Sequence, residues 1–254
     1  MPDSTSENSS WDFVYPVARL RDRRWSAQID VSRPQLGLHQ LALDGTPLDG
    51  QLLSVVPSDV SPWSPKVADA YVRGNDLVAT YEPTADWPYA PQLDWRAEPA
   101  DDVEGVIASL ALLVSIQTSL LDTHPRIDVA SCLPADEVLR VAIGDGEDVH
   151  VEAFLGGERT IHPRANVCCV LRRLPGGKLS YAELMPASDF RQLAVEYQLD
   201  GVCRTRWELF AEFLEKGVIR RARLQLALLD QDHDLELAAA SGHGLKRRPL
   251  PLTT

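Results

Sequence analysis

The sequence predicts an all-β protein, built as a large antiparallel β-sandwich with little helix. The first observation is strict alternation towards the C-terminal end. From Cys203 to Leu209 the odd-numbered residues are apolar or small, and the even-numbered ones are arginine or glutamate. From Val218 to Leu228 the even-numbered residues are apolar except for Arg220. Side chains of a strand point alternately to its two faces, so each run predicts a strand with one dry and one wet face.

The second observation is the spacing of turn residues. Short alternating runs are separated about every ten residues by pairs such as Asp44-Gly45 and Asp200-Gly201, which favour tight turns between antiparallel strands. A dozen or more short strands separated in this way imply packed antiparallel sheets.

The N-terminal half of the chain fits this reading element by element. We expect strands at Trp25–Val31, Leu36–Leu43 and Leu52–Val56, a proline-rich loop at Pro57–Pro65, and a hairpin from Tyr71 to Tyr81 around Gly74-Asn75-Asp76. The run from Val106 to Leu121 is the ambiguous one. Its even-numbered residues are apolar apart from a threonine, which favours one long strand, but its alanines and leucines keep a buried helix open.

The C-terminal half predicts three further hairpins, at Leu139–Phe154, Val167–Leu184 and Phe190–Phe210. For the last hairpin, a two-residue turn would mix dry and wet faces. We therefore expect a three-residue connection or a bulge, with Val195 opposite Trp207 and Glu196 opposite Arg206. Leu235–Ala240 is expected to be a last edge strand. The expected organisation is a disordered segment at 1–10, one β-sandwich domain at 11–240 and a tail at 241–254.

Charge and cysteine content narrow the function classes. The formal net charge is −12, which disfavours binding to nucleic acid and to anionic membranes. The first ten residues are polar without a basic or apolar signal region, and the longest apolar run is too short to span a bilayer, so we expect a cytoplasmic protein. Four cysteines without a C-x-x-C pair favour buried thiols. No cofactor is indicated.

The strand rhythm resembles a known family. The series Ile29-Asp30-Val31, Leu36-Gly37-Leu38, Leu43-Asp44-Gly45 and the late segment from Arg206 to Arg220 are similar in style to the β-supersandwich of galactose mutarotase-like proteins. The resemblance implies a large sandwich and, in the sugar epimerases of that family, a histidine and a glutamate as acid and base. No residue of this sequence is assigned to either role, and the catalytic residues are unknown.

Two features suggest a ligand site. Trp87, Tyr89 and Trp95 lie in or beside a proline-rich segment, where flat rings could stack on a sugar, or could instead pack over one end of the sandwich. Arg220 interrupts an apolar face and must be ion-paired, at a strand end open to water or at a cavity, with Glu208, Glu212 or Glu215 as partners. Isolated histidines such as His150 and His162 do not predict a metal site.

These observations lead to three hypotheses about function. The first is a carbohydrate-binding or polar-ligand-binding module that uses Trp87, Tyr89, Trp95 and Arg220. The second is a structural or assembly protein, which would show buried aromatics and an exposed apolar sheet face, and for which a homo-oligomer is possible. The third is a mutarotase-like enzyme, which should bring a histidine and a carboxylate together in one pocket.

Overall fold

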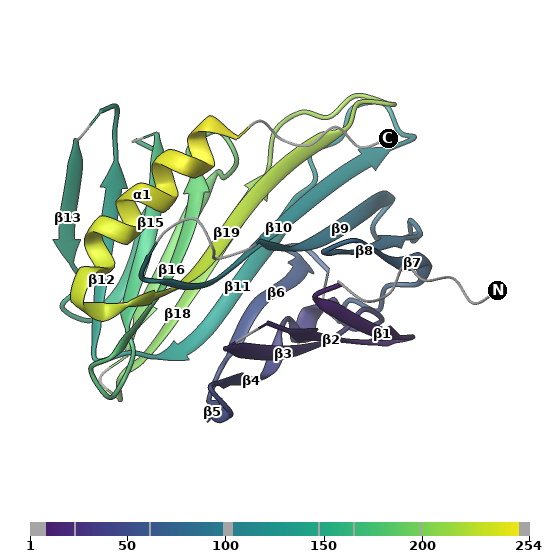
Figure 1. The fold of residues 1–254 in the computed structure, drawn as a ribbon. Coiled ribbons are helices and arrows are strands. Elements are labelled where there is room, and N and C mark those ends of the chain that lie inside the picture. The colour runs from purple at the N-terminus through teal and green to yellow at the C-terminus, as the bar shows by residue number, and fades with distance from the viewer. Residues whose placement is uncertain are drawn as a thin grey trace.

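The structure is a computed structural model, and it describes residues 9–22, 24–60, 62–98, 104–146, 148–164, 166–198 and 200–248. It contains three antiparallel β-sheets and one α-helix, which confirms the predicted all-β, sandwich-like fold (Figure 1). No helix in the described ranges has the length and apolar character needed to cross a membrane. Residues 1–8 and 249–254 of the predicted terminal segments lie outside the described residues.

We name the sheets by position and size. The N-terminal sheet has the order β1-β2-β3-β4-β5 and contains β1 (Trp11–Val14), β2 (Val17–Arg21), β3 (Trp25–Asp30), β4 (His39–Leu43) and β5 (Thr46–Leu48). The small sheet has the order β14-β17-β18-β11-β6 and contains β6 (Gln51–Pro57), β11 (Arg126–Pro134), β14 (Gly157–Ile161), β17 (Gln192–Tyr197) and β18 (Val202–Phe210).

The large sheet has nine strands in the order β13-β12-β15-β16-β19-β10-β9-β8-β7. Its members are β7 (Val67–Arg73), β8 (Asp76–Tyr81), β9 (Tyr89–Glu98), β10 (Val106–Thr118), β12 (Glu137–Ile143), β13 (Val149–Ala153), β15 (Val167–Arg173), β16 (Leu179–Pro186) and β19 (Arg220–Asp230). Short 3₁₀ turns occupy Pro34–Leu36 and Gln231–His233. The ambiguous apolar run is therefore a strand, β10, because it pairs on both sides, with β9 and β19.

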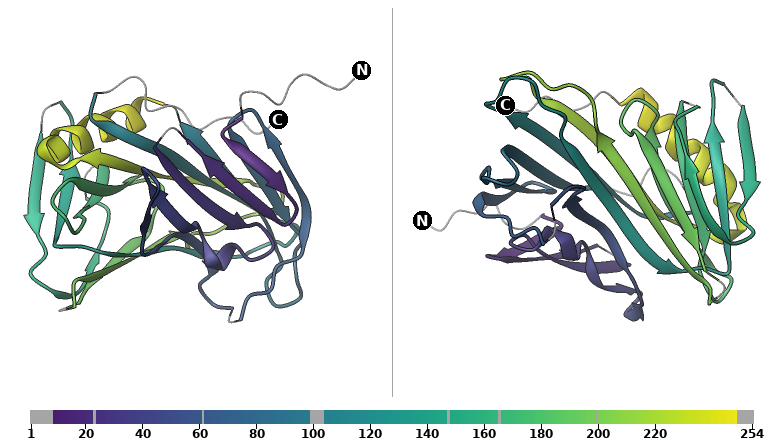
Figure 2. Two further views of the ribbon diagram at one scale, coloured as in Figure 1. Left: turned by 60° about the horizontal axis from the view of Figure 1, so that its bottom comes forward. Right: turned by 180° about the vertical axis from the view of Figure 1, so that it is seen from behind.

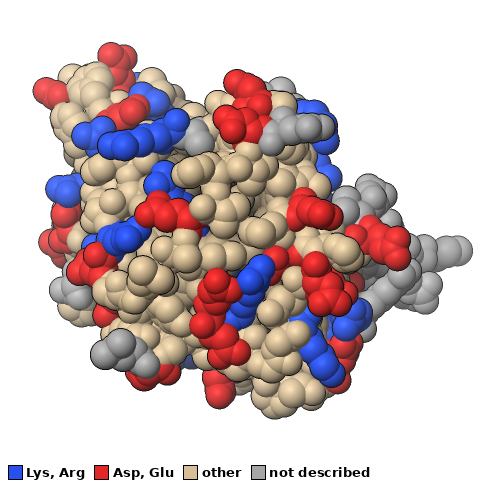
Figure 3. All heavy atoms as spheres, turned by 90° about the vertical axis from the view of Figure 1, so that its left-hand side faces the viewer, with Lys and Arg blue, Asp and Glu red and all other residues tan. Residues whose placement is uncertain are grey.

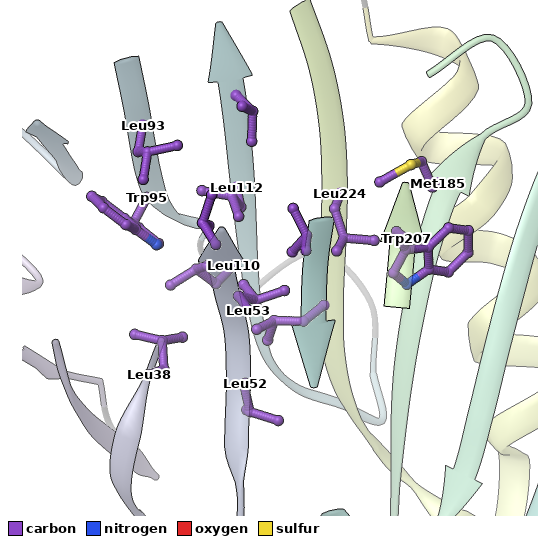
Figure 4. Close-up of a cluster of buried hydrophobic side chains, with 14 of the residues drawn as sticks. Leu38, Leu52, Leu53, Leu93, Trp95, Leu110, Leu112, Met185, Trp207 and Leu224 are labelled. Carbon is purple, nitrogen blue, oxygen red and sulfur yellow. The ribbon is translucent and has the colours of Figure 1, made fainter. Parts of the chain in front are cut away.

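The main core lies between the large and small sheets. Leu110 and Leu112 of β10 and Leu224 of β19 point towards Leu53 of β6 and Trp207 of β18, and all five side chains are buried (Figure 4). In β18 the inward residues are the odd-numbered ones, as the alternation predicts. The N-terminal sheet packs beside this sandwich, and the buried Tyr81 hydroxyl of β8 donates a 2.9 Å hydrogen bond to the carbonyl of Val31.

The predicted edge strand at Leu235–Ala240 is wrong. The chain from Asp234 to Arg247 is an α-helix, α1, which lies against the outer face of the large sheet (Figures 1 and 2). The buried apolar side chains of α1, Leu237, Ala238 and Leu245, lie with the buried Gly242 on one face of the helix, and they complete a second core on β12, β15, β16 and β19. The predicted wet face of β19 is consequently dry where α1 covers it, at Ala227 and Leu229.

The hairpin from β17 to β18 confirms the predicted loop length but not the predicted pairs. Gln198 and Val202 are joined by a hydrogen bond from the amide of Gln198 to the carbonyl of Val202, which leaves three residues in the connection. Val195 pairs with Thr205, and Glu196 pairs with Arg204, two positions from the expected partners. A shift of two preserves which face each side chain occupies, so burial alone does not distinguish the two registers.

Candidate functional site

A pocket forms at one end of the small sheet, where several chain segments meet. Because the strands are antiparallel, the end of β14, the start of β17, the end of β18 and the start of β11 lie at the same edge. The pairs Ile161–Leu193, Gln192–Glu208 and Phe210–Arg126 show this arrangement. The start of β19 completes the site. The pocket has a volume of about 440 Å³, and the residues that line it include His162, Asp189, Arg191, Phe210, Glu212, Arg220 and Arg221.

The pocket combines cationic and anionic groups. Three arginines and two carboxylates line it, together with one histidine. Asp189 is held in place by the Ser188 hydroxyl, which donates to Oδ1 at 2.6 Å, and by the backbone N–H of Arg223, which donates to Oδ2 at 2.9 Å. Burial raises the pKa of the Asp189 carboxyl above its ordinary value. The site therefore offers both donors and acceptors of hydrogen bonds.

Arg220 meets the expectation of an ion-paired residue at a cavity. It is the first residue of β19, its side chain is 48% exposed, and its Nη1 lies 3.2 Å from Oε2 of Glu212. Glu212 is one of the three partners that the sequence suggested. The apolar face of β19 begins only at Ala222, so the charge of Arg220 stays in contact with water. Arg220 also lines the pocket.

The predicted aromatic residues lie elsewhere. Trp87 and Trp63 are buried and their ring centroids are 5.9 Å apart, while Tyr89 approaches Trp87 at 5.1 Å. Trp95 is fully buried in β9, and Figure 4 shows it facing the core beside Leu93 and Leu112. None of the predicted aromatics lines the pocket of Arg220. A ligand role for these rings stays a prediction.

The sequence did not single out Asp189, Arg191 or Phe210, and it named His162 only as an isolated histidine. A signal was present for Asp189, Arg191 and Phe210, because they lie at or beside the ends of the predicted Phe190–Phe210 hairpin. His162 directly follows β14, a strand that the sequence did not predict. Strand ends that share an edge could have been grouped once the strand order was known. Among the described residues, no group of three or more His, Cys, Asp or Glu side chains could hold a metal ion.

Exposed apolar side chains bear on the assembly hypothesis. The large ones include Leu120 and Leu121, in the connection after β10, and Phe213, Val218 and Ile219, in the connection before β19. These five residues lie in the two connections. Val14, Tyr71 and Val151 are also exposed, and they lie singly in the edge strands β1, β7 and β13. Trp87 and Trp95 are buried, as that hypothesis expects, and Tyr89 is half-buried. The exposed loop residues do not form the exposed apolar sheet face that the hypothesis also requires. The oligomeric state stays a prediction.

No family model and no curated protein matches the chain. The fold, however, is similar to solved structures. A galactose mutarotase related enzyme from Lactobacillus acidophilus superposes with a TM-score of 0.53 at 9% identity, covering 83% of this chain and 96% of that one. The protein HI1317 gives 0.50 at 8% identity, covering 84% and 91%.

A larger protein also contains a similar region. The GH36 α-galactosidase AgaB from Geobacillus stearothermophilus gives a TM-score of 0.47 at 9% identity, and the match covers 87% of this chain but only 41% of that protein. At identities this low, such comparisons concern the fold alone. The superposition on the mutarotase related enzyme from Lactobacillus acidophilus confirms the resemblance in fold that the strand rhythm indicated.

Proposed function

We propose that the protein binds a carbohydrate, preferably one that carries a carboxylate, in the pocket at the end of the small sheet. The observation that carries the proposal is the set of groups in this pocket: guanidinium groups, carboxylates and the ring of Phe210 around a space of about 440 Å³. This volume is within the range of about 300–1,000 Å³ that is common for small-molecule sites. The similarity in fold to a galactose mutarotase related enzyme supports a sugar as the class of ligand.

Each part of the pocket has a counterpart in a sugar. Hydroxyl groups both donate and accept hydrogen bonds, so they need carboxylates such as Asp189 and Glu212 as well as arginines. The half-buried Phe210 ring offers an apolar surface to the C–H face of a sugar ring. Three arginines against two carboxylates leave a cationic excess before His162 is counted, and a guanidinium binds a carboxylate through two parallel hydrogen bonds.

A matched pair of variants tests this proposal. Arg220→Ala removes a guanidinium from the pocket, whereas Arg24→Ala removes one from the Arg24–Asp44 pair on the N-terminal sheet, where the side chain is similarly exposed (49% against 48%). Thermal shift and calorimetry with uronic acids and neutral sugars should show binding that Arg220→Ala weakens at least about tenfold, or about 1.4 kcal/mol. Equal affinities for the two variants, or no binding by the wild type, would contradict the proposal.

A second candidate is a sugar-active enzyme of the mutarotase type, because His162 and two carboxylates line the same pocket. In that reaction a base removes the proton of the anomeric hydroxyl while an acid protonates the ring oxygen. The bond from C1 to the ring oxygen breaks as the carbonyl forms, and reclosure gives the other anomer. Exchange NMR on α- and β-galactose should then show acceleration that His162→Gln abolishes and His150→Gln, in β13, retains. A rate equal to that of buffer would eliminate this candidate.

A further inference from the structure

A second hollow lies next to the proposed site. It has a volume of about 220 Å³ and is formed between the β12–β13 hairpin, at the edge of the large sheet, and β14, at the edge of the small sheet. Its charged and aromatic lining comprises Arg140, Glu152, Phe154, Arg159, His162 and Arg164. His162 lines both cavities, so the two hollows adjoin at this residue.

The second hollow has an excess of guanidinium groups. Among the described residues that line it, three are arginines and one, Glu152, is a carboxylate. Glu152 is shared: its Oε1 lies 2.5 Å from Nη1 of Arg159, and its Oε2 lies 3.6 Å from Nη1 of Arg140. The single negative charge of Glu152 is therefore divided between two arginines, and Arg164 adds a third positive charge to the lining. Figure 3 shows that on the side where β13 lies, Lys and Arg are generally interspersed with Asp and Glu, so this excess is local.

Arg140 has unused hydrogen-bonding capacity. It lies opposite Glu152 across the strand pair, its side chain is 23% exposed, and its Nε is buried without a hydrogen-bond partner among the described residues. A buried donor without an acceptor costs about 1–3 kcal/mol. An anionic oxygen in the hollow would accept from the terminal guanidinium nitrogens of Arg140, because Oε2 of Glu152, 3.6 Å from Nη1, is beyond ordinary hydrogen-bond distance. Arg159 is positioned by its carboxylate partner and by the Phe154 ring, 5.5 Å from its guanidinium carbon.

We infer that the complete site takes an acidic oligosaccharide, with one uronate unit in the Arg220 pocket and a neighbouring uronate in the Arg140 hollow. The inference rests on the proposed function and names its ligand class. A monosaccharide occupies only the larger pocket, whereas a chain that passes His162 places successive carboxylates near two separate groups of arginines. The chain as a whole carries a net charge of −12, so local cationic hollows are needed to hold such a ligand.

Calorimetry with paired uronates tests the inference. The probes are galacturonic, glucuronic and mannuronic acids, their trimers, and neutral trisaccharides of the same linkage. We expect the wild type to bind one trimer at least tenfold more tightly than its monomer, and the neutral trimer to show no such gain. Arg140→Gln/Arg164→Gln should remove most of that gain while leaving monomer affinity unchanged, and Arg220→Ala should weaken monomer and trimer alike.

The outcomes separate the two proposals. If a monomer binds through Arg220 but its trimer gains nothing, or the neutral trimer gains equally, the second subsite is wrong and the proposed function stands. If no uronate binds at all, both are wrong. Arg164→Gln alone, in the loop after β14, serves as the second variant if the double variant does not fold. A trimer gain that Arg164→Gln leaves intact, with a salt dependence equal to that of the monomer, would also overturn the inference.

Discussion

Asp94 is a residue whose charge the fold disfavours. It lies on β9 with its side chain 14% exposed, and its Oδ1 is buried without a hydrogen-bond partner among the described residues. Burial, together with the negative charge of Asp76, raises the pKa of Asp94 to about 6, although Arg96 and Arg73 oppose the shift. The folded state thus binds this proton more tightly than the unfolded chain does, so the protein loses stability as the pH rises from about 4 to about 6.

Asp94→Asn should therefore stabilise the protein above pH 6. A shift of about two pKa units corresponds to about 3 kcal/mol at most, and we expect a gain of about 1–3 kcal/mol at pH 7.5 that disappears near pH 4. Urea denaturation at several pH values measures this difference. Asp76→Asn is the control on the same face: Asp76 accepts two 2.7 Å hydrogen bonds from Arg96, so this variant should lose stability at pH 7.5. A gain for Asp94→Asn that does not vary with pH would disprove the titration argument.

At the residue scale, the sequence predicts alternation well and partners poorly. The glutamate partner of Arg220 was among three candidates because strand-end residues pair within a short stretch of chain. Arg96 follows Trp95, one of the predicted ligand residues, directly in the sequence, yet it binds Asp76 of the neighbouring strand. That contact depends on the register between β8 and β9, which single-strand periodicity does not contain.

At the element scale, α1 carries a test of its own packing. Gly242 is buried against the large sheet, and a Cβ added there would overlap Cδ1 of Ile143. Gly244 has open space around the same position. Alanine favours a helix over glycine by about 1 kcal/mol, whereas overpacking a core costs about 1–3 kcal/mol. Gly244→Ala should thus stabilise the protein by about 0.5–1 kcal/mol, and Gly242→Ala should be at least about 1 kcal/mol less stable than Gly244→Ala.

Chemical denaturation of the two alanine variants checks this contact. Both variants replace glycine by alanine in the same helix, two residues apart, so both gain the same helix propensity. They differ only in the atoms that the added methyl group contacts. If both variants gained equally, the close packing of α1 on Ile143 would be incorrect. If both lost stability, the helix itself would be in doubt.

The sequence around α1 imitates other structures, which is why it predicts a strand there. Leu235 and Leu237 alternate with Glu236, which imitates a strand, and Gly242 and Gly244 resemble a tail. The helix is explained by the hydrogen bonds that fix its two ends to the large sheet. Arg173 of β15 binds Asp234 through hydrogen bonds of 2.9 and 3.1 Å, and the Ser180 hydroxyl donates to the same carboxylate at 2.7 Å. At the other end, the Arg223 guanidinium donates to the carbonyls of Leu245 and Arg248. These contacts join distant parts of the chain.

At the scale of the whole molecule, the pocket also depends on contacts between distant parts of the chain, which local sequence patterns do not contain. The fold class follows from local alternation and turn residues, because the alternating pattern of a strand is contained within a few consecutive residues. The pocket depends on which strand ends share an edge. His162 and Arg191 approach because β14 pairs with β17, and Arg220 joins them where the chain passes from β18 of the small sheet to β19 of the large sheet. Strand order is a property of the complete sheet, which explains why Arg220 was identified and most of its pocket neighbours were not.

A buried polar network links the large sheet to the small sheet. Arg172 of β15 and Glu183 of β16 are both fully buried, with Nη2 of Arg172 3.4 Å from Oε2 of Glu183. Across the core, Thr205 and Trp207 of β18 donate hydrogen bonds to the same oxygen at 2.7 and 2.9 Å. Burial favours the neutral acid, but the charge of Arg172 and these donors prevail and lower the pKa of Glu183. The carboxylate therefore serves as the shared acceptor between the sheets.

Glu183→Gln should destabilise the protein by about 3–5 kcal/mol at pH 7, because it leaves the Arg172 cation buried without a counter-charge. Arg172→Met/Glu183→Gln removes the isolated cation, so its cost should be lower than the sum of the two single variants by at least about 1–2 kcal/mol. Urea denaturation followed by tryptophan fluorescence measures the cycle. The penalty of Glu183→Gln should shrink as the pH falls through the lowered pKa of Glu183, because the wild type then loses the same charge. Strict additivity of the two substitutions would mean that the ion pair does not join the sheets energetically.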